Sequence, residues 1–385
     1  DHKYDPITQK DFYQIYAFFN NFDGNPETGG RSGPDFYRGL QPPYIDLPNN
    51  DQKAKLAGFN AQIKSAQDRI TRIKTVLGFP VIPADDPEFS EMTKEQVSAK
   101  IKEAEKRTGE IQKQRSHFLR QVRGAMVMRE RKDINPAHIR VRGDYATIGE
   151  KVSRNTPAFL PPLKASGEIP SRMDLANWLV DQKNPLTARV AVNRFWQQLF
   201  GTGIVKTSED FGAQGMWPSH PKLLDHLTLQ FMEAGWDVKA FMKSLVLSET
   251  YQQSSSGNSV DFETDPENLL LARGSRTRLD SEVIRDQLLS VTGLLNPGMG
   301  GRSIKTPQPA GLWKMVALPS SFPNKFEPAT GPDTQRRSIY TFWKRGLAPP
   351  QMTIFDAPSR DACIARRERT NTPLQALLLM NETEY

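Results

Sequence analysis

Apolar residues recur at alternating spacings of three and four between residues 56 and 77. A second series with the same spacings, mainly apolar but with Thr108 and Arg115 among its positions, runs between residues 97 and 125. This heptad spacing is typical of helices that pack together along a single seam. A loop with three prolines separates the two stretches. We therefore expect residues 51–123 to form an antiparallel coiled-coil hairpin, with a seam that includes Ile63, Ile70, Ile73, Ile101, Ile111 and Phe118.

From residue 166 onward the pattern changes to a series of shorter helices with clear start and stop signals. Ser171 and Asp174 have the spacing of a capping box, and Asn184 with Pro185 opens a helix that Gly201 ends. Four further helix starts follow at Ser219, Asp237, Asp280 and Thr372. The sequence thus predicts a multi-helix globular domain over residues 166–385.

The remaining segments are less regular. Residues 1–50 begin with a short amphipathic helix and continue as a Gly- and Pro-rich loop, and we interpret them as the tail of an upstream domain. Residues 124–165 hold short strand-like runs and a proline-rich stretch, which indicates a strand-containing connector. The expected fold class is mainly α: a coiled-coil hairpin followed by a helical domain with a few short strands and long irregular loops.

Composition narrows the class of protein. Of the 385 residues, 37% are hydrophobic and 25% are charged, as expected of a folded globular chain. No apolar run approaches the roughly 20 residues that a membrane span needs, so none is predicted. The net charge of +7 reflects Lys- and Arg-rich helix surfaces, and nucleic acid is not expected as a partner.

The chain has a single cysteine, Cys363. One cysteine excludes an internal disulfide, a CxxC redox pair, a cysteine-based zinc site and a CxxCH haem-attachment motif within these residues. We therefore expect no covalent cofactor on this chain. A metal site is not predicted either, because His220 and His226 are six residues apart, whereas metal-binding pairs on one helix face are spaced by three or four.

One loop gathers residue types that suit a polar pocket. The stretch from Thr207 to Ser219 contains Asp210 and Gln214 and leads to His220, while the preceding helix carries Arg194 and Trp196. An acid, a neutral base, an amide, a cation and an aromatic platform together have the composition of a binding site. The competing interpretation is that these groups satisfy one another and only fix the loop. No catalytic residue is identified.

Several strings resemble a known family. The opening DHKYDPITQKDFYQIYAFFN is similar to the segment that directly follows the CxxCH motif in planctomycete cytochrome c domain-containing proteins. The strings NPLTARVAVNRFWQQLFGTGIVKTSEDFGAQGMWPSHPKLLDHL, RLDSEVIRDQLLSVTG and TNTPLQALLLMN resemble the terminal domain of those proteins. The chain thus resembles the end of the domain of unknown function fifteen-forty-nine followed by the domain fifteen-fifty-three, truncated at both ends.

The resemblance implies export from the cytoplasm, to the periplasm or the cell surface. It implies haem c in the parent protein, attached upstream of Asp1. By the same resemblance His2 lies two residues after the haem-ligating histidine, so its two open roles are a second-shell contact to that haem and a local structural contact. The expected function is that of the C-terminal region of a multidomain c-type cytochrome, which frames the upstream haem for electron transfer or a redox reaction. The expected partners are the upstream haem-bearing segment, a redox partner protein and polysaccharide.

Two alternatives stay open. One is an extracellular module that binds or processes polysaccharide, and the other is a structural surface or assembly protein in which the hairpin is an arm. No paired-carboxylate motif of the glycosidase type is visible, so whether the chain is an enzyme is left undecided.

Overall fold

The computed structural model describes most of the chain, namely residues 4–24, 40, 42–78, 87–257, 259–316, 326–344 and 347–382. These residues are mainly helical, with two small two-stranded sheets. The predicted fold class is therefore confirmed. Among the described helices, none combines the length and the apolar composition needed to cross a bilayer. His2 lies outside the described residues, and its predicted role near a haem stays a prediction.

The chain divides into two compact units. Gln9–Pro157 form one, while Asp1–Thr8 and Ala158–Tyr385 form the other. The predicted hairpin 51–123 and residues 124–157 of the predicted connector 124–165 lie in a single unit, because strands on either side of the hairpin pair with each other. The first eight residues group instead with the C-terminal helices.

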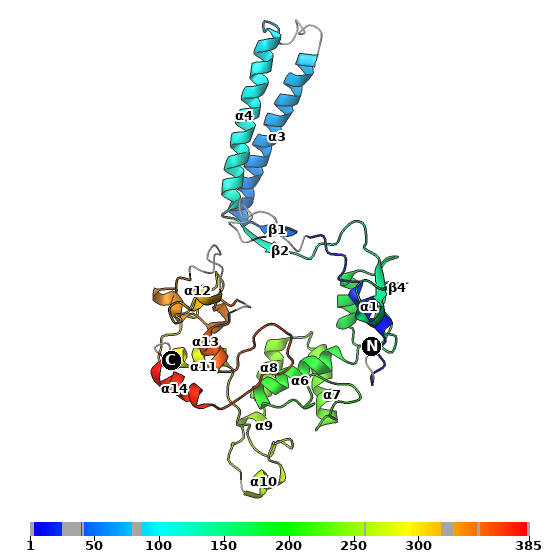
Figure 1. Cartoon of the computed structure of the whole chain (residues 1–385), viewed down its shortest axis with the longest axis vertical. Helices are drawn as coiled ribbons and strands as arrows, with labels where there is room; N and C mark the ends of the chain where they lie inside the picture. Colours follow the sequence, from blue (N-terminus) through cyan, green and yellow to red (C-terminus); the bar gives the residue numbers. More distant parts are fainter. Residues whose placement is uncertain are drawn as a thin grey trace. The chain divides into compact units, whose positions relative to one another are not determined.

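The hairpin consists of α3 (Asn50–Gly78) and α4 (Lys94–Leu119), which run side by side in opposite directions (Figure 1). Thr93 caps α4 with a capping box. Its hydroxyl accepts the Gln96 backbone N–H, and the Gln96 side-chain oxygen accepts the Thr93 backbone N–H. The buried part of the seam lies near the loop that joins the helices, and comprises Ile73, Val76, Phe89, Val97 and Ile101.

At the base of the hairpin, β1 (Tyr44–Leu47) pairs antiparallel with β2 (Arg123–Met126), with Tyr44 opposite Met126. The second sheet pairs β3 (Ala137–Arg140) with β4 (Ile148–Val152) around the short 3-10 helix η1 (Val141–Gly143), and α1 (Gln9–Tyr16) packs on it. Arg154, with a side chain 4% exposed, ties these parts together by donating to Ala17 O and pairing with Glu130. Of the strand-like runs expected in residues 124–165, residues 125–126 fall in β2 and residues 138–140 in β3, while residues 127–129 lie outside the strands.

In the second unit, α5 (Arg172–Leu179) leads to α6 (Thr187–Phe200), α7 (Pro221–Glu233), α8 (Val238–Val246) and α9 (Glu249–Gln252). The apolar faces of α6, α7 and α8 form the largest buried cluster of the described residues, which includes Val192, Trp196, Phe200, Leu224, Leu227, Phe231, Phe241 and Leu245. This cluster anchors α6, and α6 in turn positions the side chains considered below.

Two helix starts differ from the sequence prediction. Helix α6 begins at Thr187, two residues after Pro185, because the Asn184 Oδ1 accepts the N–H groups of Leu186 and Thr187 from outside the helix. Helix α7 begins at Pro221, and Ser219 does not cap it. The Ser219 hydroxyl is instead hydrogen-bonded to Ile204 O and to His220 Nδ1.

The C-terminal helices are short and are joined by long irregular stretches, as predicted. They are α10 (Ser259–Thr264), α11 (Ser281–Val291), α12 (Leu312–Val316), η3 (Gly331–Gln335), η4 (Ser338–Tyr340), α13 (Pro350–Ile354) and α14 (Pro373–Asn381). Arg285 on α11 is 1% exposed and donates to Thr334 O, Arg336 O and Ser338 Oγ. The segment 334–338 is thus held against α11 by hydrogen bonds from a buried guanidinium group, where apolar packing would be usual.

Candidate functional site

Asn193 fixes the loop that follows α6. Its side chain is fully buried, and its Oδ1 accepts the Val205 N–H at 2.8 Å while its Nδ2 donates to the Val205 carbonyl at 3.0 Å. The Asn193 amide therefore satisfies both the N–H and the carbonyl of Val205, as a paired β-strand would. Gly203 permits this approach, since a Cβ there would collide with the Asn193 side chain.

The stretch from Thr207 to Met216 is held mainly by its own groups. The Thr207 hydroxyl donates to the Asp210 carbonyl at 2.8 Å and accepts the Met216 N–H at 2.9 Å. The Asp210 carboxylate accepts the Gly212 N–H at 2.7 Å. Asp210, predicted as an acid of the pocket, is thus engaged in shaping the loop that carries it.

The five sequence-predicted pocket residues do not converge. Arg194 and Trp196 are two positions apart on α6, so they project about 200° from each other around the helix. Trp196 is 5% exposed and stacks on Phe200 with ring centroids 3.9 Å apart, which leaves no free face for a ligand. Gln214 is exposed on the loop.

Trp196 and His220 do line one cavity, together with Phe200, Gly203 and Ile204. Its volume is about 20 Å³, and a cavity of that size holds about one water molecule. The interpretation in which these groups fix the loop therefore accounts for Trp196, Asp210 and His220 better than a shared pocket does.

A larger cleft opens on the opposite side of α6. Arg194, Gln198 and Gly201 line it from the helix, at the spacing that places side chains on one face. The facing wall is the segment 358–370, which contributes Arg366, Arg367, Glu368, Arg369 and Thr370. Its volume is about 750 Å³, within the range of small-molecule sites. Asp280, the residue before α11, completes the lining.

Two of the cleft's arginines are anchored by carboxylates at the start of α11. Arg367 forms a fork with Glu282 at 2.6 and 3.2 Å and lies 3.8 Å from Asp280, and Arg369 lies 3.7 Å from the same Asp280. Burial tends to raise the pKa of Glu282, but the hydrogen bonds and charge of Arg367 outweigh it and lower that pKa below its ordinary value of 4.5. The pKa of Arg367 is raised in turn, because its bonds to Glu282 outweigh its own burial.

Asp356 holds Thr370, a residue of the cleft lining, in place. Its carboxylate pairs with Arg278 and accepts both the N–H and the hydroxyl of Thr370. Burial raises the pKa of Asp356, yet the hydrogen bonds from Thr370 and Arg278 lower it overall. The segment 358–370 is therefore held at both of its ends, by Asp356 and by the Arg367–Glu282 pair.

Arg194 and Arg366 differ from their neighbours. Within the part of the chain that the structure describes, neither guanidinium has an ion pair or a hydrogen bond, and both residues are exposed at the cleft. Sequence reasoning missed Arg366, Arg367 and Arg369, although the run of three arginines within residues 366–369 was a visible signal. The ion pairs of Asp280 and Glu282 with Arg367 and Arg369 have a structural role, since they hold the segment that carries these arginines.

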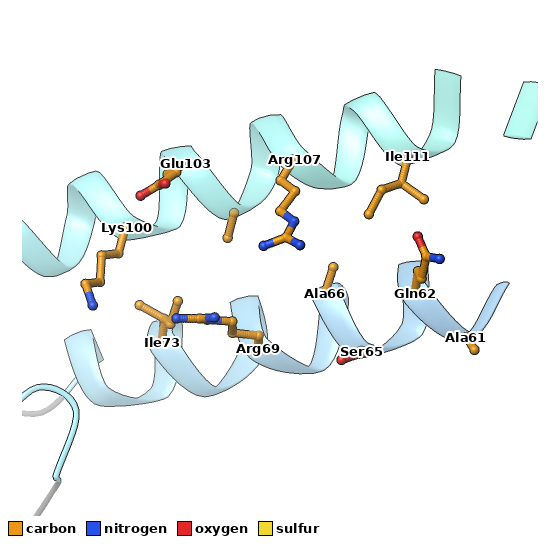
Figure 2. A pocket seen from close by; sticks show the side chains of 11 residues that line it. Ala61, Gln62, Ser65, Ala66, Arg69, Ile73, Lys100, Glu103, Arg107 and Ile111 are labelled. Carbon is orange, nitrogen blue, oxygen red and sulfur yellow. The ribbon is translucent and has the colours of Figure 1, made fainter. Parts of the chain in front are cut away.

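The hairpin carries a second, different hollow. A groove of about 500 Å³ lies between α3 and α4, and the small side chains of Ala66 and Ala104 are part of its lining. Figure 2 shows Ala66 on α3, between the labelled side chains of the two helices. Arg69, Lys100, Glu103 and Arg107 surround the groove. Charged residues beside a coiled-coil seam are typical of a solvated helix face, so this groove has the character of a packing gap.

Metal-ligand chemistry is not gathered anywhere among the described residues, in which no group of three or more His, Cys, Asp or Glu side chains is placed to hold an ion. Cys363 is exposed and unpaired beside the cleft residue Ile364. The chemistry that the described residues do concentrate is that of guanidinium groups, which bind oxyanions in two-pronged geometry.

Comparison with known proteins gives one match. Residues 171–385 match the family described as PSD1, a protein of unknown function (DUF1553). No curated protein and no solved structure matches the chain. The matched range covers more than half of the chain and includes α5 through α14, with both Asn193 and the arginine-lined cleft. The chain belongs to the DUF1553 family of proteins of unknown function.

Proposed function

We propose that this chain is the extracytoplasmic C-terminal region of a multidomain c-type cytochrome, and that its DUF1553 domain holds an upstream haem-bearing segment in place for electron transfer. The proposal rests on the resemblance of residues 1–20 to the segment that follows a haem-attachment motif. The chain's own residues do not fit covalent haem c, because Cys363 is its single cysteine and attachment uses two. In this proposal the haem is attached upstream of Asp1, as the resemblance implies.

One hydrogen bond carries the proposal. The Asp5 carboxylate accepts the Ala213 N–H at 2.9 Å, across 208 positions of the chain. It also lies against Gly212, where a Cβ would collide with that carboxylate. Residues 1–8 accordingly group with residues 158–385 in one compact unit. A haem-bearing segment directly before Asp1 would be tethered at the loop that starts with Asp210.

A spectrum of the parent protein tests the proposal. The protein that includes the sequence upstream of Asp1 should show a Soret band that survives acid denaturation, and the present chain alone should show none. Hydrogen exchange then tests the contact itself. Asp5→Ala should speed exchange of the Ala213 amide, whereas Glu168→Ala, which removes an exposed carboxylate of the same unit, should not. Absence of the Soret band from the parent protein would refute the proposal.

A module that binds extracellular polysaccharide is the second candidate, and Trp217 favours it. This side chain is 91% exposed on the loop before α7, and exposed aromatic rings offer an apolar face with a polar edge on which sugars stack. Titration of dextran while the tryptophan fluorescence is followed tests this candidate. A saturable change that Trp217→Ala removes would support it, and no saturable change would count against it.

A further inference from the structure

The cleft along α6 collects positive charge beyond what its own carboxylates balance. Arg194, Arg366, Arg367 and Arg369 line it, against the carboxylates of Asp280 and Glu368 in the lining and of Glu282, which pairs with Arg367. Asp280 already faces both Arg367 and Arg369. Like charges crowded at one site repel each other unless an anion joins them. The pattern is therefore that of a site that lacks its anionic partner.

The geometry points to a binding site for a ligand that carries oxyanion groups, namely carboxylate, sulfate or phosphate. Guanidinium forks match the paired oxygens of all three. Arg194 and Arg366 have no ion pair or hydrogen bond among the described residues, so both forks are available to a ligand. The site is independent of the proposed haem role, since no cleft residue takes part in the contact between Asp5 and Ala213.

The cleft is preorganised for such a ligand. Arg194 projects from α6, which is fixed by the buried cluster around Val192 and Trp196. The opposite wall is held through the fork between Arg367 and Glu282. A Cβ built on Gly201 would lie 3.5 Å from the Arg369 guanidinium, which places that arginine close to the end of α6. Binding groups held in this way lose little freedom when a ligand arrives, which favours affinity.

The size and composition of the cleft indicate the kind of ligand. A volume of about 750 Å³ admits a molecule larger than a single inorganic ion. The lining offers amide and hydroxyl groups from Gln198 and Thr370, its apolar side chains are those of Pro358, Ile364 and Ala365, and polar groups make up the larger part of it. We therefore expect a polar ligand with more than one oxyanion group, rather than an apolar acid.

Calorimetric titration of the intact chain tests the site. The probes are inorganic sulfate, inorganic phosphate and citrate, each against sodium chloride of equal ionic strength. At least one of these probes should bind saturably. Tighter binding of citrate would identify carboxylate as the preferred ligand group, and tighter binding of sulfate or phosphate would identify a tetrahedral oxyanion. Arg194→Ala and Arg366→Ala should each weaken binding about tenfold or more, the effect of losing a charged hydrogen-bonded contact.

The matched control is Arg302→Ala, which removes an exposed arginine of the same unit that does not line the cleft. It should leave binding unchanged, and all three variants should melt like the parent chain because these guanidinium groups stabilise nothing in the described structure. The inference is overturned if no probe binds saturably. It is equally overturned if Arg302→Ala weakens binding as much as the cleft variants do, or if the cleft variants leave it intact.

Discussion

The side-chain amide of Asn193 pairs with the backbone of Val205 in both directions, accepting its N–H at 2.8 Å and donating to its carbonyl at 3.0 Å. This pair connects the middle of α6 to the loop that carries Asp210 and, through Ala213, to Asp5. The loop is thus a fixed surface on which the start of the chain can rest.

Asn193→Ala should destabilise the C-terminal unit by about 2–4 kcal/mol. It leaves the buried Val205 N–H without a partner, at about 1–3 kcal/mol, and leaves the Val205 carbonyl with only the long 3.4 Å hydrogen bond from Ser208. Urea unfolding measures this as a lower midpoint with an unchanged slope. Gln198→Ala, at an exposed position of the same helix, is the control and should cost less than about 0.5 kcal/mol. Equal costs for the two variants would show that the pair does not hold the loop.

Arg285→Lys should be costly even though it keeps the charge. The buried guanidinium donates to Thr334 O at 2.5 Å and Arg336 O at 2.9 Å, and an ammonium cannot reproduce that planar fork. We expect a loss of about 2–3 kcal/mol in chemical denaturation. Arg302→Lys, on the surface, should stay within about 0.5 kcal/mol of the parent chain. A tolerated Arg285→Lys would mean that the segment 334–338 is held by other contacts.

The pair formed by Glu282 and Arg367 predicts a pH dependence. Because the pKa of Glu282 is lowered below 4.5 in the folded chain, its contribution to stability is present above about pH 4.5 and is lost as the pH falls through the folded pKa. The difference in unfolding free energy between the parent chain and Glu282→Gln should therefore narrow as the solution is acidified from neutral pH. A difference that stays constant down to the acid limit of folding would contradict this.

The hairpin should unfold independently of the C-terminal unit. Ile73 is fully buried in the seam, and Ile73→Asp places an unpaired charge there, which costs several kcal/mol. Circular dichroism should show loss of helix without a change in the transition of residues 158–385. Lys64→Asp, at an exposed position of α3, should retain the helix. If Ile73→Asp abolished every transition, the hairpin would be part of a single cooperative core.

Local patterns predicted much of this fold. The heptads between residues 56 and 125 indicated α3 and α4, and the capping box at Ser171 marked the start of α5. Such features depend on neighbours in the sequence, so they can be read from it. Asn184 was predicted to be the N-cap of α6. Its side chain does accept the N–H groups of Leu186 and Thr187, but it lies before the first turn of the helix. The residue type alone does not determine this turn geometry.

The sites depended on tertiary structure and were harder to predict. Arg194 and Trp196 were assigned to one pocket, but the helix sends one into the cleft and the other into the core. The cleft combines Arg194 with Arg366, which are far apart in the sequence, and the segment that carries Arg366 is held by ion pairs of Arg367 to Asp280 and Glu282 at the start of α11. No spacing rule connects such residues.

The most direct test of the account is a potentiometric titration of the parent protein, followed at its Soret band. Gly212→Ala puts a methyl group against the Asp5 carboxylate, whereas Gly167→Ala meets nothing within 4 Å and is the matched control. If the loop holds the haem-bearing segment, Gly212→Ala should free that segment and lower the haem potential, because greater exposure to water favours the more highly charged oxidised state. Gly167→Ala should leave the potential unchanged. Identical potentials for the two variants and the parent protein would contradict the claim that this domain frames the haem.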